Sequence, residues 1–133
     1  MEATGAMPAP AGLNVLVVED DALVAMDIEM NVEEAGHVVI GRATTACEAI
    51  DAARRTPPDV VLMDLRLADG SFGGDAARAI LREHGVRSIF LSGNLDPETR
   101  AKLADLEPIA MINKPFLPHE LTRALEAVDE TAN

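Results

Sequence analysis

The sequence predicts an α/β domain with an open parallel sheet and helices on both faces. Five short apolar runs alternate with five segments of helical period, and two of the runs, VLVV and VVLM, have no polar interruption. Uninterrupted apolar strands are typical of parallel sheets that are buried on both faces. Strands that alternate with helices favour the same fold class, so we take the elements in order.

The first strand is expected at Asn14–Val18, where Val predominates. Either of Asp20 and Asp21 can cap the helix that follows, and Gly36 is placed to end that helix. His37–Gly41 is predicted to form the second strand.

Thr44 or Thr45 can cap the second helix, and Glu48 stands about where a capping box needs an acidic side chain. Pro57 closes this helix. The third strand is expected at Asp59–Met63, directly before a further aspartate.

A loop over Leu65–Gly74 is predicted to lead into a third helix over Asp75–His84. Gly85 provides the stop signal of that helix. The fourth strand is expected at Val86–Leu91.

Asp96, which is followed by proline, predicts the start of the fourth helix, and Pro108 predicts its end. The fifth strand is expected at Ile109–Ile112 and the last helix at Leu117–Val128.

The chain of 133 residues is predicted to hold one domain, over residues 13–129. Residues 1–12 are Ala, Gly and Pro around one charge, so we expect a flexible lead, and we expect residues 130–133 to form a frayed tail. We expect no output domain beside it.

Charge and composition exclude several classes of function. A net charge of −12, with no stripe of Lys or Arg, disfavours direct nucleic-acid binding, and 2% aromatic residues disfavour base stacking. The single Cys47 cannot form an internal disulfide bond. Because no segment suits a secretory signal or a membrane span, we expect a cytoplasmic protein without membrane contact.

The polar residues that follow the predicted strands point to phosphoryl chemistry. In open parallel sheets ligands bind beyond the carboxyl ends of the strands, which here carry acidic side chains, a hydroxyl and an amine. Carboxylates can hold a hard cation such as Mg²⁺. The bound cation and a nearby ammonium offset the repulsion between a carboxylate nucleophile and a phosphoryl group. A hydroxyl can hydrogen-bond a phosphoryl oxygen. The residues at these positions are Glu19, Asp20, Asp21, Asp64, Ser92 and Lys114.

Four motifs, VLVVEDD, PDVVLMDLRLADG, IFLSG and NKPF, resemble in order and spacing the receiver domain of bacterial response regulators across roughly residues 13–128. The resemblance implies a flavodoxin-like, doubly wound fold with five parallel strands in the order 2-1-3-4-5 and five helices. The segments DALVAMDIE, EEAGHVV and LADGSFGGDAA are most similar to receivers of alphaproteobacterial general-stress and light signalling.

The resemblance implies that Asp64 is the phosphoacceptor, fed by a histidine kinase or a histidine phosphotransfer protein. Glu19, Asp20 and Asp64, with the backbone carbonyl of Arg66, then correspond to the ligands of Mg²⁺, or of Mn²⁺ in its place. Lys114 corresponds to the cation that pairs with the phosphoryl group.

Further roles follow from the same resemblance. Ser92 corresponds to the switch hydroxyl, Pro115 is expected to follow a cis peptide bond, and Asn94, like Arg66, flanks the site where side chains influence the lifetime of the acyl phosphate. Met111 stands where many receivers carry an aromatic switch residue. The downstream partner is expected at the face formed by the fourth helix, fifth strand and fifth helix, with the domain acting as shuttle, phosphate sink or diffusible output.

Three other classes compete with this interpretation. A phosphohydrolase of the haloacid dehalogenase type would need a second Asp two residues after the nucleophile, where this chain has Arg66. A flavin-binding protein would need a phosphate-cradling loop in place of Glu19-Asp20-Asp21. A receiver that binds partners without being phosphorylated is the third class. We expect no enzyme beyond self-catalysed phosphorylation and dephosphorylation.

Overall fold

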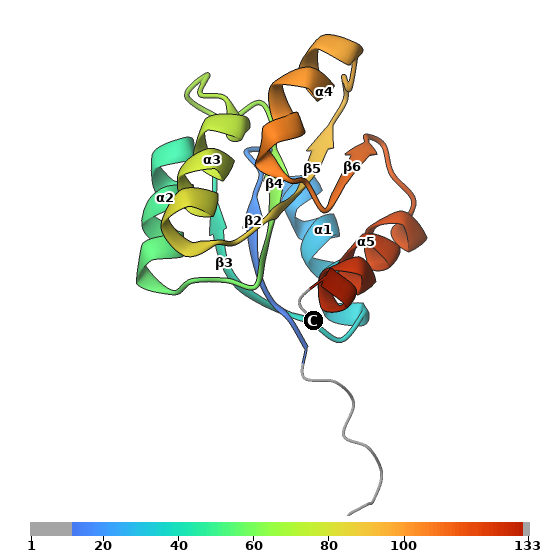
Figure 1. Cartoon of the computed structure of the whole chain (residues 1–133). Helices are drawn as coiled ribbons and strands as arrows, with labels where there is room; N and C mark the ends of the chain where they lie inside the picture. Colours follow the sequence, from blue (N-terminus) through green and yellow to red (C-terminus); the bar gives the residue numbers. More distant parts are fainter. Residues whose placement is uncertain (1–11, 132–133) are drawn as a thin grey trace, which may run out of the picture.

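The computed structural model describes residues 12–131 and contains one five-stranded parallel sheet in the order β3-β2-β4-β5-β6 (Figure 1). In chain order this is 2-1-3-4-5, so the predicted fold class and strand order are confirmed. The strands are β2 (Asn14–Val18), β3 (Val38–Ala43), β4 (Val60–Asp64), β5 (Ser88–Ser92) and β6 (Ala110–Asn113).

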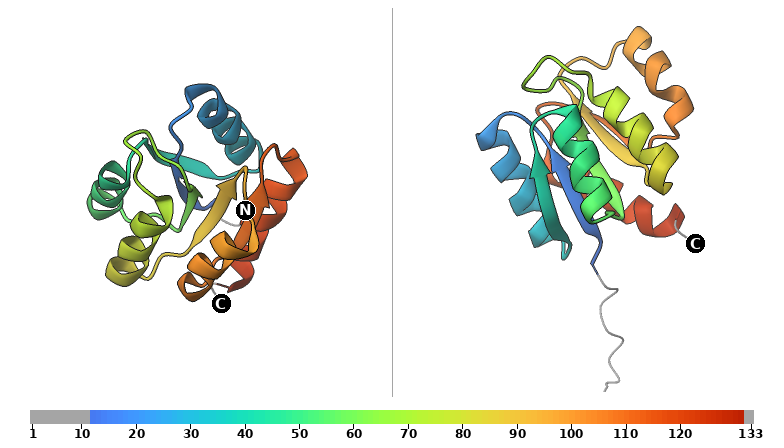
Figure 2. Two further views of the ribbon diagram at one scale, coloured as in Figure 1. Left: turned by 90° about the horizontal axis from the view of Figure 1, so that it is seen from above. Right: turned by 90° about the vertical axis from the view of Figure 1, so that its left-hand side faces the viewer.

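The helices cover both faces of the sheet, with α1 and α5 on one face and α2, α3 and α4 on the other (Figures 1 and 2). The described chain contains α1 (Ala22–Glu34), α2 (Ala46–Arg55), α3 (Gly73–His84), α4 (Pro97–Leu103), the short 3₁₀ helix η1 (Ala104–Leu106) and α5 (Pro118–Thr131). None of these helices is long and apolar enough to cross a membrane.

Each face of the sheet carries its own core because side chains alternate along a strand. On the central strand β4, Val61 and Met63 pack beneath α2 and α3, whereas Val60 and Leu62 pack beneath α1 and α5. All five residues of β4 are buried, which explains the uninterrupted apolar run in the sequence. Its last residue, Asp64, is thereby fixed at the carboxyl edge of the sheet.

Capping residues place the helix starts close to where the sequence predicts them. Asp21 caps α1 by accepting from the backbone N–H groups of Leu23 and Val24, and the Thr45 hydroxyl accepts from the Glu48 N–H at the start of α2. The Glu48 carboxylate returns to the N–H of Thr44 rather than of the cap residue itself, a displaced form of the capping box.

Several element bounds differ from the prediction. Helix α3 begins at Gly73 rather than Asp75, because the extended Phe72 serves as its cap and the Gly73 N–H donates to the Leu65 carbonyl at 2.9 Å. Strand β3 continues past Gly41 to Ala43, and a register shift between Val15 and Leu16 accommodates the longer pairing.

The last helix is longer than predicted, and most of the residues expected to be flexible lie outside the described part of the chain. Helix α5 extends to Thr131, beyond the predicted end at Val128, so the first two residues of the expected frayed tail are helical. The flexible lead expected over residues 1–12 falls outside the described residues except for Gly12, and residues 132–133 fall outside them too.

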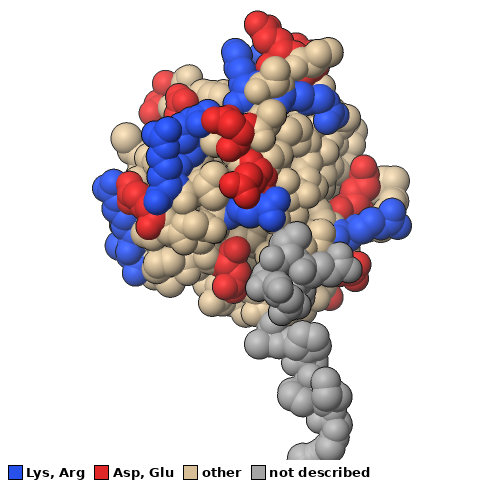
Figure 3. All heavy atoms as spheres, viewed as in Figure 1, with Lys and Arg blue, Asp and Glu red and all other residues tan. Residues whose placement is uncertain are grey.

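Positive and negative side chains alternate over the face of the molecule shown in Figure 3 rather than gathering by sign. Arginine–carboxylate pairs tie neighbouring elements together with N–O distances of 2.6–2.8 Å. Such partly exposed pairs contribute modestly to stability. They are Arg42–Glu29, Arg54–Glu83 and Arg78–Asp105.

Candidate functional site

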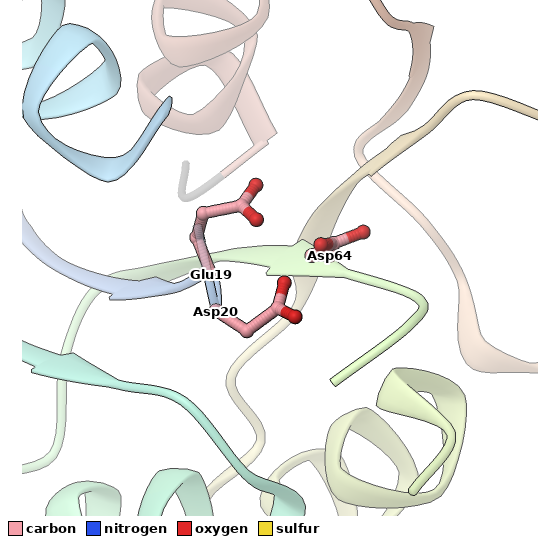
Figure 4. A group of neighbouring side chains, drawn as sticks. All are labelled: Glu19, Asp20 and Asp64. Atoms are coloured by element: carbon pink, nitrogen blue, oxygen red, sulfur yellow. The ribbon is translucent and has the colours of Figure 1, made fainter. Parts of the chain in front are cut away.

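Three carboxylates meet at the carboxyl edge of the sheet. Glu19 and Asp20 directly follow β2, and Asp64 ends the neighbouring β4, so parallel pairing brings them to one place (Figure 4). One carboxylate oxygen from each residue lies within 4.8 Å of the others. Glu19 is 2% exposed and Asp64 6% exposed, whereas Asp20 is exposed to solvent.

Lys114 connects two of these carboxylates. It follows β6 on the other side of the site, and its Nζ lies 2.6 Å from Glu19 Oε1 and 3.2 Å from Asp64 Oδ2. Its backbone N–H donates to the Ser92 carbonyl, and the Lys114–Pro115 peptide bond is cis. The ammonium therefore lies next to the carboxylate that the sequence predicts to react.

Burial raises the pKa of Glu19 from 4.5 to about 7, although the hydrogen bonds from Lys114 and from the Asp21 N–H oppose the rise. For Lys114, burial lowers the pKa, but the hydrogen bond to Glu19 and the charge of Asp64 raise it by more. The site thus holds a firmly charged ammonium beside a carboxyl group that burial makes reluctant to ionise.

Three further predicted residues, Arg66, Ser92 and Asn94, line the same cleft, which has a volume of about 520 Å³. Ser92 Oγ accepts from the Asn94 N–H at 3.1 Å, so the hydroxyl is turned toward its own loop. The Arg66 N–H lies 3.4 Å from Asp64 Oδ1. The cleft is lined by Glu19, Asp20, Asp21, Val24, Asp64, Arg66, Ser92, Gly93, Asn94 and Lys114.

The donor set fits a hard divalent cation. All three clustered side chains offer carboxylate oxygens, which Mg²⁺ and Mn²⁺ prefer. Both Glu19 oxygens already accept hydrogen bonds, from Lys114 and from the Asp21 N–H, whereas Asp20 is exposed at the mouth of the cleft. The Asp64 oxygens have longer contacts, 3.2 Å from Lys114 Nζ and 3.4 Å from the Arg66 N–H, so Asp20 and Asp64 are the carboxylates best placed to contact a cation directly.

Two predicted positions lie apart from the cleft lining. Met111, on β6, pairs in register with Phe90, and its sulfur accepts from the guanidinium of Arg100 at 3.8 Å. Pro115 lines a neighbouring apolar groove of about 460 Å³ between α1 and the β6–α5 connection.

Sequence reasoning named Asp21 but missed its backbone contact in the site, and it missed Gly73 altogether. The Asp21 N–H holds Glu19, and Gly73 lies so close to the Asp64 carbonyl that a Cβ there would be 1.9 Å from its oxygen. The Gly73-Gly74 pair was the available signal, because adjacent glycines next to a predicted site often mark close backbone approach.

Comparison with known proteins identifies the family to which this geometry corresponds. The sequence profile of the response regulator receiver domain matches residues 15–126. The phyllosphere-induced regulator PhyR of Methylorubrum extorquens is 38% identical over 125 residues, 93% of this chain and 46% of PhyR. The chemotaxis protein CheY of Thermotoga maritima is 28% identical over 90% of this chain and 99% of its own length.

Solved structures show the same likeness. The receiver domain of the Erythrobacter litoralis PhyR response regulator superimposes with a TM-score of 0.81 at 33% identity, covering 90% of this chain and 92% of that domain. The chain spans about half the length of the first curated relatives that it matches.

Proposed function

Because this chain belongs to the response regulator receiver domain family, whose members act in two-component signalling, we propose that it accepts a phosphoryl group on Asp64. One observation carries the proposal: Asp64 ends the central strand with its carboxylate 3.2 Å from the Lys114 ammonium and within 4.8 Å of two further carboxylates. A nucleophilic carboxylate, a fixed ammonium and a cation-binding cluster are the groups that phosphoryl transfer to a carboxylate requires.

In the proposed reaction an Asp64 oxygen attacks phosphorus while the bond from phosphorus to a donor histidine nitrogen breaks, leaving imidazole and an acyl phosphate. Lys114, already beside Asp64, is placed to neutralise charge on the transferred group. A divalent cation on Asp20 and Asp64, with the Arg66 carbonyl as a further ligand, would supply the remaining positive charge. Ser92 would donate to a phosphoryl oxygen after leaving the Asn94 N–H.

The proposed donor is a histidine kinase or a histidine phosphotransfer protein, and we place the transfer in the cytoplasm. The proposed downstream surface is formed by α4, β6 and α5. A phosphoryl group that changes the population of two arrangements of this surface would transmit the signal by protein contact.

The sequence disfavours a turnover phosphatase of the haloacid dehalogenase type. Such an enzyme protonates its leaving group with an acid two residues beyond the nucleophile. Here Arg66 occupies that position, so the carboxylic acid of such an enzyme is missing there.

Phosphorylation with acetyl phosphate or phosphoramidate, with and without Mg²⁺, tests the proposal by intact mass. We expect a metal-dependent gain of one phosphoryl group that Asp64→Asn abolishes. Asp69→Asn, an exposed aspartate five residues further along, is the matched control and should be modified like the unaltered chain. No adduct under conditions that detect short-lived species would overturn the proposal in favour of a receiver that only binds partners.

A further inference from the structure

Two cavities share a wall beside the candidate site. The inner cavity, of about 120 Å³, borders Ser92, Asn94 and Thr99, and the outer cavity, of about 300 Å³, borders Leu67, Gly70 and Ser71 on the β4–α3 loop. The residues that line both cavities, and so form the wall between them, are Leu65, Arg66 and Phe72.

Phe72 is the aromatic residue of this wall. The chain has three Phe, no Tyr and no Trp. Phe90 is fully buried within β5, and Phe116 lies at the groove between α1 and the β6–α5 connection. Phe72 is half-buried, packs against the core beneath α2 and α3, and lines both cavities, so free space adjoins it.

The backbone of Phe72 is held in place by its neighbours. Phe72 forms an isolated antiparallel β-bridge with Arg66 and is the N-cap residue of α3. The next residue, Gly73, lies directly against the Asp64 carbonyl. The ring lies over the Cα of Gly74, where an added Cβ would approach the ring to 2.3 Å. Phe72 is therefore anchored to the end of β4 while its side chain borders the cavity that contains Ser92.

Met111 is poorly placed to respond to Ser92. It is absent from the lining of both cavities, and its sulfur is engaged by Arg100. An unbranched thioether also fills space adaptably, so a single displaced position is less well defined for Met111 than for a rigid ring.

The inner cavity, at about 120 Å³, is somewhat smaller than a cavity known to hold an aromatic ring. A protein cavity of about 150 Å³ can hold benzene. The Ser92 hydroxyl now turns toward Asn94, at the edge of this space. Turning the hydroxyl toward Asp64 would enlarge this space, which is lined by Leu65, Thr99 and Phe72 together with the polar Arg66 and Asn94.

We propose that Phe72 is the conformational switch residue of this chain, and that its ring moves from the wall into the inner cavity when Ser92 turns toward a phosphorylated Asp64. This inference rests on the proposed phosphorylation. Contact between Phe72 and Thr99 then couples the β4–α3 loop to the first turn of α4 when Asp64 is phosphorylated. Met111 has no role in this coupling.

Fluorine NMR on the full chain tests the inference. Labelling with 4-fluorophenylalanine gives three protein resonances, assigned with the variants Phe72→Leu and Phe116→Leu. Beryllium fluoride with Mg²⁺ replaces the phosphoryl group, and the signals of its bound fluorides report occupancy of the site independently. Nuclear Overhauser effects from the Phe72 fluorine to the Thr99 methyl and to the Ser71 protons locate the ring.

With the analogue bound, we expect the contact to Thr99 to strengthen and the contact to Ser71 to weaken. Met111→Leu should preserve this change, whereas Phe72→Leu should reduce the response of the Thr99 amide. Bound fluoride signals with unchanged contacts of Phe72 would overturn the switch while leaving the proposed phosphorylation intact. An absence of bound fluoride signals would overturn the phosphorylation proposal itself, and the switch with it.

Discussion

Replacing Gly73 with alanine should separate the geometry of the site from its chemistry. The new Cβ would lie 1.9 Å from the Asp64 carbonyl oxygen and 3.0 Å from its carbonyl carbon. Because real Cβ contacts are almost never shorter than 3.0 Å, the backbone around Asp64 or the start of α3 must move by about 1.1 Å.

The size of this displacement sets the expected effect. A misplacement of about 1 Å at a reacting group can cost about 100-fold in rate, so Gly73→Ala should slow phosphorylation by acetyl phosphate about 100-fold. Neither the alanine Cβ nor the main-chain carbonyl that it meets can turn aside by a rotamer change, so we expect a stability loss of about 3 kcal/mol, near the upper end for overpacking. A domain of ordinary stability stays folded after such a loss.

The assay is the initial rate of phosphorylation by intact mass, with urea denaturation on the same samples. Gly74→Ala is the control, because the atoms nearest to its Cβ would belong to the Phe72 side chain and not to the backbone of Asp64. The control should phosphorylate within a few-fold of the unaltered protein. A Gly73→Ala variant that is stably folded and phosphorylates at the original rate would refute the claim that this glycine positions Asp64.

Three further predictions follow from other contacts. Lys114→Met should slow phosphorylation about 100-fold in the same assay, because it removes the ammonium beside Asp64. The same variant should bind Mg²⁺ more tightly in calorimetry, because the Lys114 ammonium competes with Mg²⁺ for Asp64. The metal-free protein should lose stability as the pH rises from 4.5 through 7, because the raised pKa of Glu19 makes its ionisation unfavourable in the folded state; Glu19→Gln should lessen this slope in urea titrations. Leu121→Ala, at a fully buried position on α5, should cost about 3 kcal/mol, whereas Arg54→Ala on the surface should cost less than about 1 kcal/mol.

The sequence was sufficient for the fold class because its signals are local, whereas the strand order was expected from the resemblance to receiver domains. Asp21, Thr45 and Asp96 each cap a helix where a polar residue precedes an apolar period, and Gly85 ends α3 with a φ of 69°. The rule that parallel strands share one carboxyl edge then brings Glu19 and Asp64 together without any knowledge of distances. Residue type and position along the chain were enough to predict these helix ends and the meeting of Glu19 with Asp64.

The contacts within the site depend on relations that residue types do not encode. Nothing in the order of residues indicates that Lys114 lies closer to Glu19 than to Asp64, because that depends on the path of the cis-linked loop after β6. The same holds for Phe72, whose aromatic character is visible in the sequence but whose two neighbouring cavities arise from the loop conformation.

The ion pairs of Lys114 have a consequence for the order in which signals can arrive. The site gathers three carboxylates around a single ammonium that two of them already share, so an approaching phosphoryl donor, itself anionic, meets an excess of negative charge. A cation meets the opposite potential, so in the proposed reaction we expect it to bind first. On that reaction we expect sequential loading, in which a phosphoryl donor transfers its group only after a divalent cation is bound.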